Sequence, residues 1–285
     1  MNATPPFLIV ENERAEDKEY LNLLIYGVHG AGKTFLAGTC VDIAEMNDVF
    51  MLSVEGGDMT LRNNQEHDFR NIDKVQARNF SQIAAVQKFL IAHCGMRDRE
   101  DESGVKDLCE WEEYLKGKPA GSIKRPKRYR TIIIDSLTEI DSIHRNMLLG
   151  IEDDTPLEID PNEGSWAIYN KNLSRLGRFV KQLRDLPIHT IFTCGRKFDK
   201  EERKNKPKLV GQFADDVQGI VDVVGFLKRG TVDLNTGEVP RALAVMPGDD
   251  YDAKCRWSAN TQPVFIDPTV GKILAAVGLT EVETM

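Results

Sequence analysis

The feature that most constrains the fold of this chain is a glycine-rich loop of the pattern G-x-x-x-x-G-K-T. Its residues are Gly27, Val28, His29, Gly30, Ala31, Gly32, Lys33 and Thr34. A short apolar run, residues 20–26, precedes the loop, and residues 35–44 carry apolar side chains at helical spacing behind it. The order of strand, loop and helix predicts a phosphate-binding loop.

The residue types of the loop suit that chemistry. Glycine adopts backbone angles that a side chain would forbid, so successive N–H groups can converge on a polyphosphate. In this motif Lys33 is expected to reach the β- and γ-phosphates of a nucleotide, and the Thr34 hydroxyl to ligate Mg²⁺. The loop therefore predicts ATP and Mg²⁺ as cofactors.

Two later apolar runs end in acids. Residues 49–55 end on Glu55, and residues 131–135 form a β-branched run that ends on Asp135. Open parallel sheets bind ligands at the carboxyl ends of their strands, so both acids are expected beside the loop. A strand ending in Asp after a phosphate loop is typical of a Walker B strand, whose carboxylate supports Mg²⁺. Glu55 either acts on the attacking water or only begins a turn.

Nucleotide contacts are accordingly predicted for all eight loop residues, for Phe35 directly behind them and for Asp135. The predicted metal ligands are Thr34 and Asp135, and the predicted catalytic residues include Lys33 and Glu55.

Composition narrows the class of protein. The chain has 285 residues, of which 41 % are hydrophobic and 29 % charged, as in soluble globular proteins. No apolar run approaches the roughly 18 residues of a membrane span, and the N-terminus lacks a signal pattern. We expect a cytoplasmic protein with no membrane partner, or one in the host cytoplasm if a phage encodes it. The net charge of −8 means that any nucleic-acid surface must be local.

Two polar segments interrupt the apolar pattern. Residues 196–211 read as a long basic loop, which inside a compact domain is usually functional or disordered. Its cations are Arg196, Lys197, Lys200, Arg203, Lys204, Lys206 and Lys208. Residues 97–130 form a polar excursion with a basic end, either a solvated face or a contact surface. No linker divides the chain, so we expect one domain over residues 1–285 with a core at 20–260.

The order of the phosphate loop, Glu55 and the Asp135-Ser136 pair resembles the RecA-like ATPase core. Over residues 20–260 the chain looks like the RecA-like ATPases that phages encode for single-strand annealing and recombination. The resemblance implies an α/β fold of three layers with a mostly parallel central sheet. The turn residues 235–237 lie between two short apolar pieces and predict a C-terminal β-hairpin extension.

The resemblance also implies roles for particular residues. Glu55 stands where the family has the general base, and the two DNA-contacting loops fall at residues 151–164 and 196–211. Only the second is basic enough to contact phosphates, which predicts single-stranded DNA as a partner. Lys254-Cys255-Arg256 resembles the K-x-R element with which hexameric replicative helicases reach a neighbour's γ-phosphate. Two surface cations on a strand are the open alternative.

The sequence departs from the family at one functional position. The fourth strand, residues 188–194, ends in Thr193 and Cys194 where RecA and its helicase relatives have a Gln that senses the γ-phosphate. Coupling between hydrolysis and DNA binding is therefore open. The N-terminal helical domain of true RecA proteins has no counterpart in this sequence.

The leading hypothesis is an Mg²⁺-dependent ATPase that acts on single-stranded DNA in phage recombination or replication. It is expected to form homo-oligomers and to work beside a single-strand DNA-binding protein. Two alternatives remain open: a subunit of a hexameric helicase or motor, and a nucleotide-switched binding module with negligible hydrolysis.

Overall fold

The structure is a computed structural model, and it describes residues 20–56, 60–61, 66–97, 102–151, 165–231, 239–257 and 262–279. Nearly all of the expected DNA-contacting loop at 151–164 lies outside the described residues.

A ten-stranded sheet organises the described part of the chain, in the order β10-β8-β7-β1-β5-β4-β2-β3. Strand β6 pairs with β5, and β9 pairs with β7. The strands are β1 (Asn22–Gly27), β2 (Val49–Ser53), β3 (Ile72–Gln76), β4 (Thr131–Asp135), β5 (His189–Asp199), β6 (Lys204–Pro207), β7 (Val223–Arg229), β8 (Arg241–Ala244), β9 (Lys254–Cys255) and β10 (Val264–Ile266). From β7 to β3 along this order the strands run parallel, whereas β8, β9, β10 and β6 pair antiparallel.

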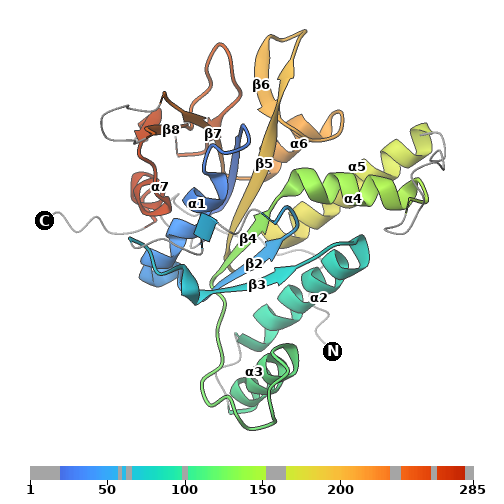
Figure 1. Cartoon of the computed structure of the whole chain (residues 1–285), viewed down its shortest axis with the longest axis vertical. Helices are drawn as coiled ribbons and strands as arrows, with labels where there is room; N and C mark the ends of the chain where they lie inside the picture. Colours follow the sequence, from blue (N-terminus) through green and yellow to red (C-terminus); the bar gives the residue numbers. More distant parts are fainter. Residues whose placement is uncertain are drawn as a thin grey trace, which may run out of the picture.

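Helices cover both faces of this sheet, as Figure 1 shows. They are α1 (Lys33–Gly38), α2 (Phe80–Arg97), α3 (Glu102–Leu115), α4 (Leu137–Leu148), α5 (Trp166–Arg184), α6 (Phe213–Ile220) and α7 (Val270–Ala276). One hydrophobic cluster joins the sheet to α2, α4, α5 and α6, and a second joins it to α1 and α7. The sheet is therefore the middle of three layers.

The alternation of side chains along β1 explains this layering. Leu24 and Tyr26 belong to the first cluster, whereas Leu23 and Ile25 belong to the second. Successive side chains of a strand point to opposite faces, so a continuous apolar run is what a strand covered on both sides requires. Burying each large apolar side chain contributes about 1.5–3 kcal/mol.

The predicted α/β class is confirmed: the fold has three layers, a mostly parallel central sheet and a C-terminal hairpin. Strand β5 lies between β1, which leads into the phosphate-binding loop, and β4, which ends on Asp135. The hairpin pairs β7 with β8, so its first strand lies earlier than the residues near 231 that we expected. The apolar run of β7 itself continues into the hairpin.

Residues 196–207 do not form the open loop that we expected. They form the end of β5 and the whole of β6, which pair antiparallel from Arg196–Pro207 to Asp199–Lys204. We call this segment the β5–β6 ribbon; it stands at the top of the molecule in Figure 1. The Asp199 side chain closes its turn by accepting the N–H groups of Glu201 and Glu202. The sequence pattern predicted a loop because the side chains here are mostly polar. The strands form nevertheless, since backbone groups make the hydrogen bonds between them.

The polar excursion contains α3, which lies at the far end of the molecule from the β5–β6 ribbon (Figure 1). The basic end of the excursion contacts the rest of the fold through Lys127. The backbone N–H of Lys127 donates to Glu112 at 2.7 Å, and the Lys127 ammonium lies 3.3 Å from Asp73. Within the described ranges, no helix has the length and apolar character needed to cross a bilayer.

Candidate nucleotide-binding site

The phosphate-binding loop joins the end of β1 to α1 at the carboxyl end of the parallel strands. Gly30 and Gly32 have φ angles of 72° and 94°, in the left-handed region that favours glycine. The N–H of Leu36 donates to the Gly32 carbonyl at 2.9 Å, so α1 begins directly at the loop. The glycines of the motif therefore stand where the backbone requires them.

Lys33 and Thr34 begin α1 and have different partners. The Lys33 ammonium donates to the carbonyls of Gly27 at 3.4 Å and Val28 at 3.1 Å, on the loop itself. The Thr34 hydroxyl donates to Oδ2 of Asp135 at 2.9 Å, although the two residues are far apart in the sequence. The structure thus brings the three predicted nucleotide and metal residues into one place.

Asp135 ends β4 and is 1 % exposed. Its second oxygen, Oδ1, accepts a hydrogen bond from the Thr193 hydroxyl on the neighbouring strand β5. Burial raises the pKa of Asp135 above its ordinary value, and the hydrogen bonds from Thr193 and Thr34 oppose that rise. Hydroxyl groups on two sides therefore fix the orientation of this carboxylate.

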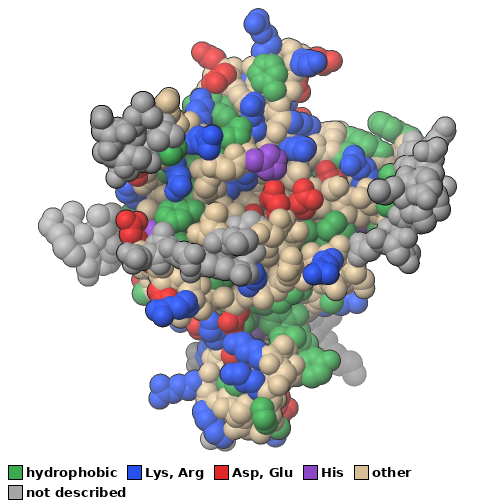
Figure 2. Space-filling view, in the orientation of Figure 1, with side chains coloured by type: hydrophobic (Ala, Val, Ile, Leu, Met, Phe, Trp, Pro, Cys, Tyr) green, Lys and Arg blue, Asp and Glu red, His purple; other side chains and the backbone are tan. Residues whose placement is uncertain are grey.

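Glu55 lies just beyond β2, beside the loop residue His29. Its Oε1 is 3.6 Å from Nδ1 of His29, and the two side chains are 29 % and 80 % exposed. The N–H groups of Val54 and Glu55 both donate to the Asp135 carbonyl, which fixes the backbone here. In Figure 2 a histidine stands beside acidic side chains near the middle of the visible face. The carboxylate of Glu55 is thus beside the loop and open to water.

The remaining predicted contacts lie within or behind the loop. Ala31 is buried and donates its N–H to the Val28 carbonyl at 3.3 Å. The Phe35 ring packs edge-on against Phe69, with centroids 5.8 Å apart, and lies under the guanidinium carbon of Arg241 at 4.9 Å. Phe35 is therefore held between an aromatic neighbour and a cation.

The residues present fit Mg²⁺ and a polyphosphate. Hydroxyl and carboxylate oxygens are the ligands that Mg²⁺ prefers, and Thr34 and Asp135 supply them side by side. Ser53 pairs in register with Asp135, and its buried hydroxyl has no hydrogen-bond partner among the described residues. Mg²⁺ usually keeps several water ligands, and such a water would satisfy this hydroxyl.

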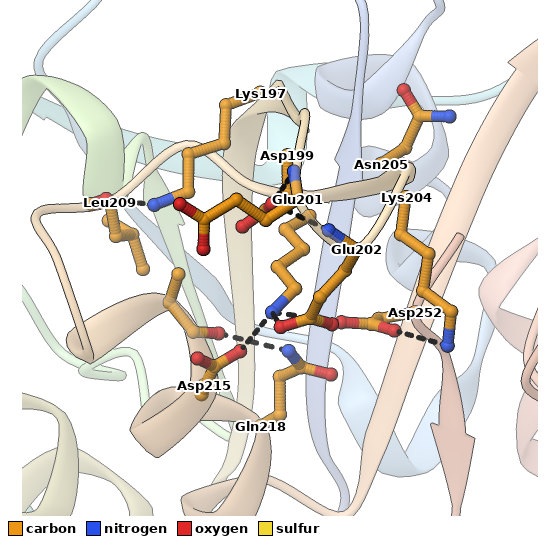
Figure 3. Close-up of polar contacts among 12 residues, drawn as sticks. Lys197, Asp199, Glu201, Glu202, Lys204, Asn205, Leu209, Asp215, Gln218 and Asp252 are labelled. Carbon is orange, nitrogen blue, oxygen red and sulfur yellow. Dashed lines mark hydrogen bonds and ion pairs between the residues drawn. The ribbon is translucent and has the colours of Figure 1, made fainter. Parts of the chain in front are cut away.

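Most predicted DNA-contacting cations of the β5–β6 ribbon are paired within the chain. Lys206 is buried, and its ammonium lies 2.6 Å from Glu202 and 3.1 Å from Asp215. Lys197 donates to the Leu209 carbonyl at 3.0 Å, as Figure 3 shows.

The same figure shows Lys204 directed at Asp252, with a nitrogen-to-oxygen distance of 3.5 Å. Arg196 donates to the side chain of Asn205 at 2.6 Å. Lys200, Arg203 and Lys208 are exposed, and no described residue is an ion-pair partner of these three side chains. The free positive charge of the ribbon is therefore smaller than its sequence indicates.

Lys254 and Arg256 lie at the opposite end of the sheet. Lys254 and Cys255 pair with the first residues of β7, roughly 10–13 Å along the strand from Leu227 at the loop end, at about 3.3 Å per residue. The Lys254 ammonium donates to the carbonyls of Gln218 and Val221 at 2.7 Å and 3.0 Å. Arg256 donates to Asp222 at 3.1 Å. In this chain both cations anchor the end of α6, and their action on a neighbour's nucleotide stays a prediction.

Sequence reasoning missed several residues of the site. Thr193 was noted only as a departure from the family, yet it holds Asp135. Thr138, near the start of α4, accepts the N–H of Gly195 at 2.9 Å and donates to the Lys208 carbonyl at 3.1 Å, so it joins the Walker B region to the base of the ribbon. Arg229 and Arg241 reach the loop from β7 and β8. No local pattern marks these contacts, because pairing between distant strands creates them.

The fold and this site together define a nucleotide-binding protein of the P-loop class. The loop, the Thr34–Asp135 pair and the acid beside them are gathered at the carboxyl end of one parallel sheet. That is where such sheets bind their ligands.

Comparison with known proteins identifies the family. The AAA domain family matches residues 19–257, and the chain belongs to that family. Among solved structures the chain is similar to that described as the crystal structure of the RadB recombinase, with 15 % sequence identity, a TM-score of 0.41 and 79 % of each chain covered. No curated protein matches the chain.

Proposed function

We propose that this protein is an Mg²⁺-dependent ATPase that acts on single-stranded DNA, of the kind that phages use in recombination and replication. The observation that carries the proposal is the hydrogen bond between the hydroxyl of Thr34 and Asp135, directly beside Lys33 in the phosphate-binding loop. This arrangement joins a phosphate-binding cation to two oxygen ligands for a metal.

Each residue has a distinct part in the proposed reaction. Lys33 leaves its loop carbonyls to bind the β- and γ-phosphates, and Thr34 and Asp135 hold Mg²⁺. When bound, the metal neutralises negative charge on the phosphate oxygens. Glu55, open to water beside the loop, accepts a hydrogen bond from the attacking water and orients it toward the γ-phosphate.

Two threonines support coupling between the nucleotide site and the β5–β6 ribbon. Thr193 bonds Asp135 and lies on the strand that continues into the ribbon. Thr138 bonds both strands where the ribbon begins, at Gly195 and Lys208. A shift of Asp135 on nucleotide binding would therefore move hydrogen-bonded groups at the base of the ribbon. These hydroxyls offer a substitute for the sensor Gln that the sequence lacks.

The tip of the β5–β6 ribbon is the proposed DNA contact. Lys200 and Arg203 are exposed there, and the aromatic ring of Phe198 is 52 % exposed beside them. Cations that neutralise phosphates and aromatic rings that stack on bases are the usual elements of single-strand binding. Lys206, by contrast, is assigned to the stability of the ribbon because carboxylates surround it.

We also propose that copies of the chain assemble, as the K-x-R element requires. Arg256 is 47 % exposed, so a neighbouring copy can reach it, although it would have to loosen its bond to Asp222. An arginine finger of this kind changes phosphoryl-transfer rates by about 10³ to 10⁵. Slow hydrolysis by the isolated chain is therefore expected.

The experiment that tests the function is steady-state ATP hydrolysis by the purified protein, with and without single-stranded DNA. Glu55→Ala should lower hydrolysis by about 10² to 10⁴. The double variant Lys200→Ala/Arg203→Ala should retain basal hydrolysis and lose most of the stimulation by DNA. Its matched control, Lys88→Ala/Lys106→Ala, removes two exposed cations from α2 and α3 and should behave as the wild type.

The outcomes separate the hypotheses. Hydrolysis that ignores DNA would contradict the proposed DNA-dependent role. Tight ATP binding without hydrolysis, even in the presence of DNA, would favour the nucleotide-switched module instead.

A further inference from the structure

Two arginines face each other on adjacent strands beside the phosphate-binding loop. Arg229 at the end of β7 and Arg241 at the start of β8 are direct partners in the antiparallel register. Like charges placed directly opposite each other across a strand pair destabilise the sheet. Neither guanidinium has an acidic ion-pair partner within the described part of the chain. The pair therefore carries concentrated positive charge that no carboxylate of the described residues offsets.

Both guanidinium groups stand over the glycines of the loop. A Cβ atom added to Gly32 would lie 2.9 Å from Nε of Arg241, and one added to Gly30 would lie 3.6 Å from a terminal nitrogen of Arg229. Figure 1 shows the β7–β8 hairpin beside α1 and the loop. The absence of a side chain at Gly32 lets Arg241 approach the backbone, and Arg229 lies within contact distance of the Gly30 position.

Arg241 is held in this place by Phe35. Its guanidinium carbon is 4.9 Å from the centre of the Phe35 ring, a cation–π contact, and Phe35 packs against Phe69. This contact engages the guanidinium carbon, and no described residue accepts a hydrogen bond from the guanidinium N–H groups. A planar guanidinium fixed in this manner suits phosphate oxygens, which it can bind through two parallel hydrogen bonds.

We propose that Arg229 and Arg241 form a phosphate clamp that binds the polyphosphate of the nucleotide held by the loop of the same chain. The inference rests on the proposed ATPase function, because it takes the loop as the nucleotide site. It differs from the K-x-R element, which lies at the other end of the sheet and whose proposed target is the nucleotide of a neighbouring copy. The clamp supplies its cations without any neighbour. Binding of polyphosphate also removes the repulsion between the two arginines.

The test is the affinity of the purified protein for ATP and for inorganic tripolyphosphate, measured by titration calorimetry at a concentration where the chain is monomeric. Arg229→Gln and Arg241→Gln should each weaken binding of both ligands by about tenfold to a hundredfold, as expected for loss of a charge-assisted hydrogen bond. Arg241→Lys should weaken binding less than Arg241→Gln, because it keeps the charge and loses the paired donors.

Lys228→Gln is the matched control. Lys228 precedes Arg229 on β7, and its ammonium lies on the side of Tyr251 and Asp250, 4.4 Å from the Tyr251 ring centre. Its affinity for ATP should stay within about twofold of wild type, which one exposed ion pair allows. Thermal unfolding without nucleotide supplies a second readout. The arginine variants should melt at or slightly above the wild-type temperature, and ATP should raise their melting temperature less.

Arginine variants that bind ATP within twofold of wild type would overturn the clamp. A fall in nucleotide-free melting temperature that accounts for the loss of affinity would also overturn it, because the arginines would then be structural. Lys33→Ala separates this failure from failure of the proposed function. If Lys33→Ala loses ATP binding while the arginine variants keep it, the loop stands and the clamp is wrong. A wild-type protein that binds neither ligand overturns both.

Discussion

The two ends of the parallel sheet carry similar charged residues in opposite circumstances. At the carboxyl end, Glu55 is open to water and, among the described residues, Lys33 bonds only carbonyls of its own loop. At the amino end, Asp222 is fully buried and accepts hydrogen bonds from the backbone of Asn22 at 3.0 Å and from Arg256 at 3.1 Å. Polar groups at the amino end are bound inside the chain, whereas those at the carboxyl end face the place where a ligand would lie.

The charged residues of a sequence are therefore not all available to bind a ligand. A lysine whose ammonium bonds carboxylates of its own chain, or carbonyls far from the ligand site, contributes to stability and is not available to the ligand. Lys254 at the amino end and Lys206 in the β5–β6 ribbon are of this kind. Burial lowers the pKa of Lys254, and the nearby charge of Arg256 adds to that effect, which is a further sign of an enclosed cation.

Removing the lysine of the phosphate-binding loop, at the carboxyl end of the sheet, should have a larger effect than the changes expected at the amino end. Lys33→Ala should lower ATP hydrolysis by about 10² to 10³, the usual loss when one donor to a developing phosphate charge is removed. Its nucleotide-free melting temperature should remain close to that of wild type, because Lys33 bonds only loop carbonyls. Lys272→Ala, which removes a lysine that bonds carbonyls near α7, is the control. Equal hydrolysis by Lys33→Ala and wild type would contradict the assigned site.

A second prediction concerns the amino end of the sheet and the dependence of folding stability on pH. Burial lowers the pKa of His189 to about 4 from its ordinary value near 6.5, and its neutral Nδ1 accepts the N–H of Leu21 at 3.1 Å. Above pH 6.5 the ring is neutral in both folded and unfolded chains. Between pH 6.5 and 4 only the unfolded chain binds this proton, so the titration of His189 should lower the free energy of unfolding by about 3 kcal/mol. Below pH 4 both states bind the proton, and His189 causes no further loss.

His189→Gln keeps a hydrogen-bond acceptor and removes the titration. Denaturant unfolding across this pH range should show a shallower decline for the variant than for wild type. His29→Gln, at an exposed loop position, should leave the decline unchanged. A variant curve that runs parallel to that of wild type would show that His189 does not titrate as assigned.

The weakest of the predicted effects distinguishes two roles for Arg256, as a structural partner of Asp222 or as an arginine finger for a neighbouring copy. Its loss removes the guanidinium that donates to Oδ1 of the buried Asp222, which should lower the free energy of unfolding by about 1–3 kcal/mol. Arg256→Lys should recover part of that stability because it keeps a cation beside the carboxylate. Thermal unfolding of the isolated chain measures both. A variant with unaltered melting and strongly reduced hydrolysis in assembled protein would instead favour the finger acting on a neighbour.

The sequence by itself determined the local elements of the site. The loop from Gly27 to Thr34 and the strands ending near Glu55 and on Asp135 were predicted, because each depends on residues close together in the chain. Glycine backbone freedom and apolar alternation act over a few residues, so a linear pattern records them. The parallel α/β class and its three layers were expected from the resemblance that these motifs carry.

The sequence did not determine which distant groups complete the site. The β5–β6 ribbon was hidden because its strands are polar, and α6 was missed between two segments read as loop and strand. The approach of Arg229 and Arg241 to the loop depends on β7 lying beside β1, which no local pattern states.

Tertiary structure also decided which cations are free. Lys206 and Arg203 are equivalent as letters in a basic segment, yet one is enclosed by carboxylates and the other is exposed. The physical reason is that the cost of burying a charge depends on partners brought by the fold, not on its neighbours along the chain. Which charges of this protein remain available to bind is therefore a property of its strand order.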